Sequence, residues 1–391
     1  MTAITTAAVA VRNAADATRQ AAIALSRQLA AASLTTDPTD PLTARQLAAA
    51  AWRVYPTDQA HAAMATLLAE QQQDGILPAT SSRYGVAGVA FSPDGKLLAS
   101  ADADGTVRLW NPATGRAPGA PLPADTGTGF GVNGVAFSPD GKLLASADGD
   151  GALRLWDPAA GQPAFPRLPV ETETSIEGPS STSPPELAVN GVAFSPDGKL
   201  LASAEADGAV WLWNPVTRQR IFPPLMADTL GYTLPGSVYG VAFSPNDKLL
   251  ASARDNGAVL MWNLATRQPA GVSPPVSAAL SGRVRGVAFS PDGNLLAIAY
   301  GGGAVLLWDP ARGQTAGVTL RAGTGSGGAY GVAFSPDGKL LATAGADGTV
   351  RTWQISLFAD PYAALCADVG PPTPANWMQN APGEPQPSVC G

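Results

Sequence analysis

The chain has few of the residues from which catalytic and metal sites are built. Among 391 residues it contains one histidine, His61, and two cysteines, Cys366 and Cys390. Metal centres and nucleophile–base pairs usually need several such residues close together. We therefore expect a protein that is not an enzyme and that carries no cofactor and no metal.

Charged residues are also scarce, and the acidic ones outnumber the basic ones. They make up 14% of the chain, and the formal net charge is −7. Proteins that bind nucleic acid carry a basic surface, so this balance argues against a nucleic-acid partner.

Long apolar runs are missing as well. No run reaches the roughly 20 residues of a membrane span, and Arg12, Asp16 and Arg19 lie where a signal peptide would need apolar residues. Two cysteines are too few for a disulfide scaffold. These absences favour a cytoplasmic protein that does not enter a membrane, and we expect it to be a monomer.

The sequence of the chain is strongly repetitive. A block of the form VAFSPDG, LLASA, DG, V and LW recurs six times, and the Phe and Trp that bound each block are always nineteen positions apart. The pairs are Phe91 and Trp110, Phe137 and Trp156, Phe194 and Trp213, Phe243 and Trp262, Phe289 and Trp308, and Phe334 and Trp353. A repeat of this period predicts units that bury their apolar faces against one another.

Each block has the pattern of an antiparallel meander. In the first block, Ser92-Pro-Asp-Gly95 is a tight-turn sequence, and Asp104-Gly105 is a two-residue hairpin signal. Apolar alternation on both sides of these turns predicts three strands. The Pro-rich stretch 116–123 is typical of an outer edge strand. Four strands per block describe one blade of a propeller.

The FSPDG turn, the DG hairpin and the Leu-Trp-Asn or Leu-Trp-Asp ending resemble the WD40 family over residues 74–356. The resemblance implies an all-β, six-bladed WD40-type β-propeller. The family's Gly-His pair is absent from all six blocks, so its hydrogen-bonded tetrad keeps only three members, for example Ser100, Asp104 and Trp110. The fifth block has Ile298 and Gly302 at the Ser and Asp positions, and we expect it to form the least rigid blade.

The remaining segments lie on either side of the blocks. Residues 1–73 predict an N-terminal α-helical segment, with helices over 5–33, 41–55 and 57–72 and N-caps at Asp40 and Thr57. We expect residues 74–80 to supply the outer strand of the last blade in the 74–356 propeller. Residues 357–391 form a C-terminal tail.

The two termini should lie together if the ring closes in this way. We then expect Trp52, Tyr55, Tyr362 and Trp377 to pack as one cluster and to bring Cys366 and Cys390 within bonding range. Whether the cysteines pair is left open, because a cytoplasm would keep them reduced.

The flanking segments carry a second resemblance. SRQLAAASL, AAAAWRVYPTDQAHAAM and the C-terminal tail resemble the flanks of the WD40 sensor half of actinobacterial STAND-type signal-transduction NTPases. The phosphate-binding motif GxxxxGK[ST] is absent from this chain. The chain therefore cannot switch by hydrolysing its own nucleotide.

Two positions vary between otherwise similar blocks, and both lie near the same rim of the expected disc. The first is occupied in chain order by Ala87, Asn133, Asn190, Tyr239, Arg285 and Tyr330. The second is occupied by Asp102, Asp148, Glu205, Arg254, Tyr300 and Gly345. We expect both sets to ring one mouth of the central channel, acidic and amide on one side and Arg and Tyr on the other.

This ring is the candidate interaction site, because Tyr and Arg are enriched at binding hot spots. The partner-binding candidates are Asn133, Asn190, Tyr239, Arg254, Arg283, Arg285, Tyr300 and Tyr330. The alternative is a solvated rim whose residues vary because nothing constrains them. We also expect the acidic insertion 169–188, which contains Glu171, Glu173, Glu177 and Glu186, to share this interface.

The predicted function is that of a non-catalytic scaffold or sensor module that binds a protein partner on one face of the propeller. The alternative is a regulatory subunit that binds a small molecule in the channel and controls an NTPase or another effector in trans.

Overall fold

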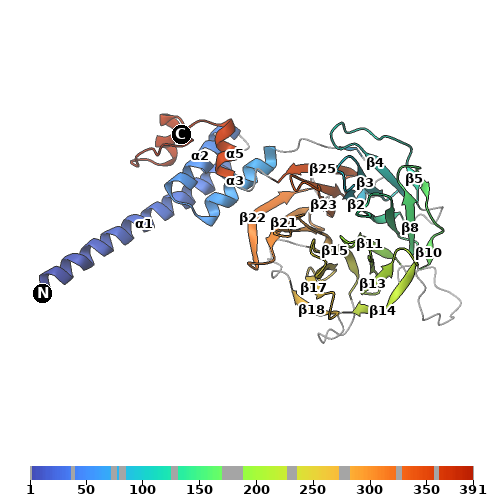
Figure 1. Cartoon of the computed structure of the whole chain (residues 1–391). Coiled ribbons are helices and arrows are strands. Elements are labelled where there is room, and N and C mark those ends of the chain that lie inside the picture. Colours follow the sequence, from blue (N-terminus) through green and yellow to red (C-terminus); the bar gives the residue numbers. More distant parts are fainter. Residues whose placement is uncertain are drawn as a thin grey trace. The chain divides into compact units, whose positions relative to one another are not determined.

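The computed structural model describes residues 2–36, 40–71, 77–78, 85–124, 131–169, 188–226, 236–272, 282–322, 328–355 and 361–390. The chain forms two compact units (Figure 1). One comprises residues 1–72, 317–319 and 356–391, and the other comprises residues 73–316 and 320–355.

The first unit is helical. It contains α1 (Thr2–Thr36), α2 (Pro41–Val54), α3 (Asp58–Gln71), α5 (Pro361–Asp368) and α6 (Pro374–Asn380). Asp40 caps α2 by accepting a hydrogen bond from the backbone N–H of Thr43 at 3.1 Å, and Thr57 caps α3 in the same way through Ala60. Both expected N-caps are confirmed.

The C-terminal segments pack onto the N-terminal helices within this unit. Helix α5 contacts α2 and α3, and the Asn376 amide donates a hydrogen bond to the Thr43 hydroxyl at 2.7 Å. Cys366 and Cys390 form a disulfide, which answers the pairing left open by the sequence. Trp52 packs against His61, whereas Trp377 is buried and donates to the Glu384 carbonyl. No described ring contact joins the four expected aromatic residues to one another.

The second unit is a propeller of six antiparallel sheets around a central axis, as predicted (Figure 1). Blade one contains β2 (Val86–Phe91), β3 (Leu98–Asp102), β4 (Thr106–Trp110) and β5 (Leu122–Pro123). Blade two contains β6 (Val132–Phe137), β7 (Leu144–Asp148), β8 (Ala152–Asp157), β9 (Gln162–Pro163) and β10 (Leu168–Pro169). Blade three contains β11 (Val189–Phe194), β12 (Leu201–Glu205), β13 (Ala209–Asn214) and β14 (Gln219–Met226).

The other three blades repeat this order from the inner strand outward. Blade four contains β15 (Val238–Phe243), β16 (Leu249–Arg254), β17 (Val259–Asn263) and β18 (Gln268–Val272). Blade five contains β19 (Val284–Phe289), β20 (Leu296–Tyr300), β21 (Ala304–Asp309) and β22 (Gln314–Arg321). Blade six contains β23 (Ala329–Phe334), β24 (Leu340–Gly345), β25 (Thr349–Gln354) and β1 (Leu77–Pro78).

The outer strand of blade six comes from the beginning of the propeller sequence. Leu77 and Pro78 of β1 pair antiparallel with Val350 and Thr349 of β25, at the place proposed for residues 74–80. The other residues of that stretch lie outside the described ones. Apolar packing joins the same two ends of the ring, because Val86, Leu98 and Trp110 of blade one share a buried cluster with Ala342, Ala344 and Val350 of blade six.

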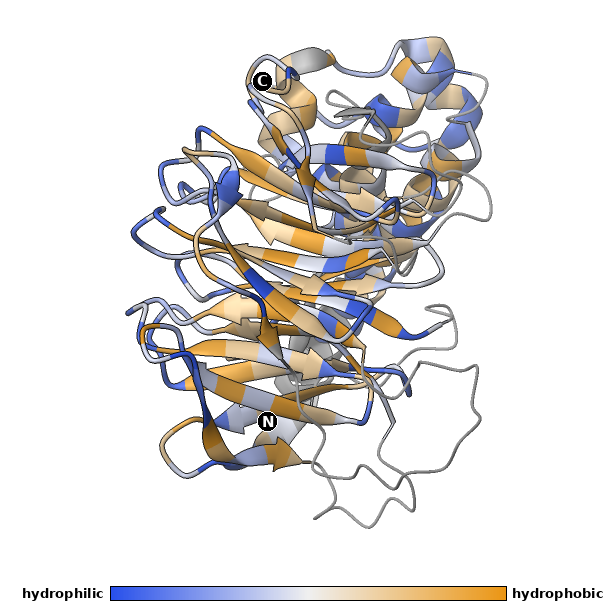
Figure 2. Cartoon of the chain, turned by 90° about the vertical axis from the view of Figure 1, so that its right-hand side faces the viewer, coloured by the Kyte–Doolittle hydropathy of each residue, from blue (hydrophilic) through white to orange (hydrophobic). Residues whose placement is uncertain are grey.

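The structure confirms the tight turns predicted from the FSPDG sequence. The Asp94 carboxylate accepts hydrogen bonds from the Ser92 hydroxyl at 2.7 Å and from the Lys96 backbone at 3.1 Å, while Gly95 has a φ of +70°. Figure 2 shows hydrophobic residues along the strands and hydrophilic residues in the turns at their ends. This separation lets neighbouring blades stack through their apolar faces.

One hydrogen bond of the family's tetrad is present, from the Trp indole N–H to a Ser or Thr hydroxyl. The Trp110 indole donates to the Ser100 hydroxyl at 3.0 Å, and blades two, three, four and six repeat this bond. Asp104 accepts from Arg108 and Thr106 within its hairpin. In blade five Ile298 replaces the Ser, and the indole N–H of Trp308 is buried without a partner among the described residues. The reduced rigidity expected of that blade stays a prediction.

Six glycines form a collar around the channel, where the inner strands come closest to one another. They are Gly88, Gly134, Gly191, Gly240, Gly286 and Gly331, one from each blade. A Cβ added to any of them would lie 2.7–3.2 Å from the Cα of the next glycine in the ring. A side chain at any of these positions would press on the backbone of the next blade, most severely at Gly191, Gly286 and Gly331, where the nearest backbone atom would lie within 2.7 Å.

Candidate functional site

A β-bulge sets the mouth of the channel. In each of the first five blades the pairing of the inner strand shifts around one residue, which is Ala87, Asn133, Asn190, Tyr239 or Arg285; in blade six the shift spans Tyr330 and Gly331. A bulged residue leaves the ladder and its side chain is re-aimed. The glycine of the collar follows directly in the chain. The first variable position of the sequence is thus the set of side chains around the mouth.

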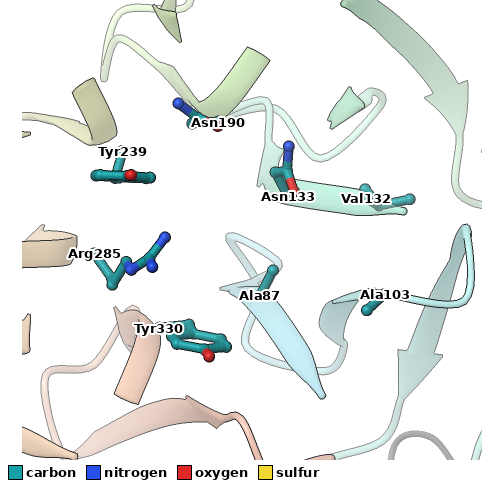
Figure 3. Close-up of a pocket in the computed structure, with 8 residues that line it drawn as sticks. All are labelled: Ala87, Ala103, Val132, Asn133, Asn190, Tyr239, Arg285 and Tyr330. Carbon is teal, nitrogen blue, oxygen red and sulfur yellow. The ribbon is translucent and has the colours of Figure 1, made fainter. Parts of the chain in front are cut away.

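These side chains line a cavity of about 210 Å³ that opens to solvent. Its lining consists of Ala87, Ala103, Val132, Asn133, Asn190, Tyr239, Arg285 and Tyr330 (Figure 3). The cavity is asymmetric, because blades four to six contribute two phenol rings and a guanidinium whereas blade one contributes two methyl groups. Beyond it the channel narrows at the glycine collar, and six valines, the first of which is Val89, line the next layer.

Arg285 lies close to two tyrosine rings. Its guanidinium carbon lies 4.3 Å from the centre of the Tyr239 ring and 5.4 Å from that of Tyr330, and Figure 3 shows it directed into the cavity. The exposed Arg283 donates a hydrogen bond from its Nη1 to the Tyr239 hydroxyl at 3.0 Å. Cation–π contacts of this kind hold a guanidinium in place without neutralising it.

Two amides lie across the mouth from Arg285 (Figure 3). The Asn133 side chain donates to the Val189 carbonyl at 3.0 Å, and the Asn190 side chain donates to the Val238 carbonyl at 2.9 Å. Each amide therefore ties its blade to the next one. These bonds use the NH₂ groups as donors. The amide oxygens can accept further hydrogen bonds.

The second variable position does not line the mouth, and the sequence-based expectation for it is wrong. Arg254 is only 8% exposed and Tyr300 only 1%, while Asp102, Asp148 and Glu205 are buried as well. The reason lies in the strand register: Arg254 is paired with Val238, and Tyr300 with Val284. Directly opposed residues face the same side of a sheet, so these side chains share the buried face between blades. Neither Arg254 nor Tyr300 is available to touch a partner.

The sequence held a signal for this burial. Asp102 follows Ser100 by two positions, so both side chains lie on one face of β3. Ser100 was already assigned to the buried bond with Trp110, and the same alternation applies to Glu205 and Ser203. Because alternate residues of a strand face the same side of the sheet, counting two positions on from the buried serine would have placed the second variable position between the blades.

The buried acids face arginines. Asp102 forms an ion pair with Arg108, and Asp148 forms one with Arg154. In blade three Trp211 occupies the equivalent place, and Arg220 of the outer strand approaches Glu205 to 3.5 Å while stacking on Trp211. Burial raises the pKa of Asp102 to about 6 and that of Glu205 to about 7, and the neighbouring arginines only partly oppose this effect.

Glu205 should make the stability of the propeller depend on pH. Its folded-state pKa of about 7 exceeds the ordinary value of 4.5, so between these values the folded state holds the proton more tightly, and stability falls as pH rises. The wild type should lose on the order of 3 kcal/mol between pH 5 and pH 8 relative to Glu205→Gln. Urea unfolding of both proteins at the two pH values measures the difference.

The exposed Glu384→Gln variant is the control, and it should follow the wild type at both pH values. If Glu205→Gln and the wild type changed in parallel, burial of this carboxylate would not control the pH dependence.

A second surface of interest lies on the outer strands. The large apolar side chains of the described propeller that remain exposed are Phe165, Val216, Phe222 and Met226, all in blades two and three. Arg218 lies over the Phe165 ring at 5.2 Å, and Phe222 packs edge-on against Trp211. This outer patch was not predicted, and it is an alternative contact surface for a partner.

The acidic insertion, with Glu171, Glu173, Glu177 and Glu186, lies outside the described residues. Within the described residues, no group of three or more His, Cys, Asp or Glu side chains is arranged to hold a metal ion. None of the described helices combines the length and apolar composition that a membrane span requires.

Comparison with known families agrees with this architecture. The model of the WD domain, G-beta repeat (WD40) family matches residues 73–111, 122–157, 176–214, 228–263, 276–309 and 317–354. No curated protein matches the chain closely enough to count as a relative. Each match contains the inner three strands of one blade, and the six matches together cover more than half of the 391 residues. The chain therefore belongs to the WD40 repeat family.

Proposed function

We propose that the protein is a non-catalytic interaction module that binds a protein partner across the channel mouth. WD40 propellers commonly act as protein-interaction scaffolds. The observation that supports this role most is the set of bulged residues, which differ between blades whose cores are alike. Tyr239, Arg285 and Tyr330 are partly buried around a cavity, which is the setting in which Tyr and Arg become hot spots.

The size of the cavity favours a partner that covers the mouth over a ligand that fills it. Pockets for drug-sized molecules measure roughly 300–1,000 Å³, whereas this one measures about 210 Å³. A single side chain of a partner fits such a space, and the surrounding rim supplies the rest of the contact area. Arg283, exposed beside Tyr239, belongs to that rim.

Substitutions at the mouth should weaken capture of the partner. Tyr239→Ala and Arg285→Ala are each expected to weaken binding by about 1–4 kcal/mol, because hot-spot truncation removes both a contact and the packing around it. The measurement compares proteins captured from the native host by wild type and variants. Phe222→Ser, on the outer patch, is the control and should capture the same partner as the wild type. Loss of capture in the control alone would move the interface to the outer strands.

A sensor that binds a small molecule in the channel is the second candidate function, and the cavity at the channel mouth is the observation that favours it. Such a protein would control an NTPase or another effector in trans, as the resemblance of its flanks to bacterial signal-transduction proteins suggests. Ligand binding raises thermal stability by mass action, so a thermal-shift screen with small metabolites separates the two candidates. We further propose that the protein acts as a monomer and binds no nucleic acid. The Cys366–Cys390 disulfide argues against the cytoplasm that the sequence favoured, because thiols stay reduced there.

A further inference from the structure

We infer that the mouth recognises a carboxylate side chain of the partner, and that Arg285 is the residue that binds it. The inference rests on the proposed function, since it names the chemical group that the partner inserts. Among the described residues that line the cavity, Arg285 is the only charged one. The acids that the sequence placed on this rim are buried between the blades instead. The mouth therefore presents a positive charge although the chain as a whole is acidic.

Arg285 and the arginines inside the blades have different neighbouring groups. Arg108, Arg154 and Arg351 each pair with an aspartate of their own blade. Arg285 has two tyrosine rings as neighbours, and its Nε is buried without a hydrogen-bond partner in the described part of the chain. The two rings hold the guanidinium in place, and it is directed into the cavity, where an acceptor can reach it (Figure 3).

A carboxylate is the group that suits this arrangement. It is planar, and it can accept two parallel hydrogen bonds from one guanidinium. The oxygens of Asn133 and Asn190 across the cavity can accept from N–H groups, such as the backbone amide next to an acidic side chain. Ala87 and Ala103 leave room between the two sides. The site thus combines an anion-binding side with an N–H-accepting side.

The small volume selects the occupant. One acidic side chain fits a cavity of about 210 Å³, whereas the part of the channel lined by the glycine collar and the valines measures only about 80 Å³. The structure therefore assigns Arg285 to an Asp or Glu of a protein partner rather than to a larger free anion.

A pair of small probes tests the assignment. N-acetyl-L-glutamate methylamide and N-acetyl-L-glutamine methylamide differ only in the carboxylate, and saturation-transfer NMR on the full chain detects weak binding of either. We expect binding of the glutamate probe and at least tenfold weaker binding of the glutamine probe. Arg285→Met should weaken the glutamate probe by about 10- to 100-fold. Arg285→Lys should weaken it less, because it keeps the charge but loses the bidentate geometry.

Arg312→Met is the matched control. Arg312 lies in the same blade, is exposed and pairs with Asp309, so its removal should leave probe binding unchanged. The glutamate and glutamine probes compared on the wild type decide the question even if an Arg285 variant fails to fold. Equal binding of the two probes, no binding of either, or stronger binding of N-acetyl-phosphoserine methylamide would overturn the assignment. The proposed function fails separately, when capture of the partner survives Tyr239→Ala.

Discussion

Gly286→Ala is expected to destabilise the propeller by about 3 kcal/mol, although it adds a single methyl group. The new Cβ would lie 2.5 Å from the Tyr330 carbonyl oxygen and 3.1 Å from the Cα of Gly331. Both are backbone atoms of the next blade, so no side chain can rotate away to make room. The blades would have to separate at the collar, which would loosen the apolar packing between blades five and six. Urea unfolding followed by tryptophan fluorescence measures the loss.

Gly119→Ala provides the comparison within the same unit. A Cβ at Gly119 meets no atom within 4 Å, so this variant should remain within about 0.5 kcal/mol of the wild type. Similar stability of the two variants would show that the collar tolerates side chains and that the six glycines do not control blade spacing.

Loss of the Cys366–Cys390 disulfide should destabilise the helical unit. The bond closes a loop across a sequence separation of 24, and cross-linking of such a loop stabilises by about 3 kcal/mol, chiefly by restricting the unfolded chain. The double variant Cys366→Ser with Cys390→Ser should therefore unfold its helical unit at a lower temperature. Calorimetry, together with hydrogen exchange in α5, reads this transition separately from that of the propeller.

Reduction of the wild type with dithiothreitol is expected to reproduce the effect, whereas reduction of the double variant should change nothing. An unchanged helical transition in the double variant would show that packing alone holds the C-terminal segment. The oxidation state of the native protein also bears on its compartment, because a reducing cytoplasm would keep both cysteines as thiols.

The repeat made most of the propeller predictable. A constant spacing from Phe91 to Trp110, copied in five further blocks, defines the strands and turns of every blade. Turn residues such as Asp94 and Gly95 act through local geometry, which sequence reasoning captures well. The glycine collar was visible as an unvarying Gly after each bulge position, yet its role depends on contacts between blades that one block cannot reveal.

The candidate site was predictable only in part, because variation between blocks has two physical causes. Tyr239 and Arg285 vary because a bulge directs them into the channel, where core packing does not dictate their identity. Arg254 and Tyr300 vary because each blade satisfies its buried inter-blade face differently, with an acid paired to arginine in some blades and a phenol ring in blade five. Sequence variation alone does not separate these causes. Strand register does, as the pairing of Tyr300 with Val284 shows.

Site-specific photo-crosslinking tests the central claim, that the partner binds at the channel mouth, most directly. Benzoylphenylalanine would replace Tyr330 at the mouth in one protein and Phe222 on the outer patch in another, and both would be irradiated with the captured partner. Mass spectrometry then identifies the crosslinked peptides. We expect the partner to crosslink to position 330 and not to position 222, with an acidic residue close to the crosslinked site. Crosslinks at position 222 and none at position 330 would contradict the claim.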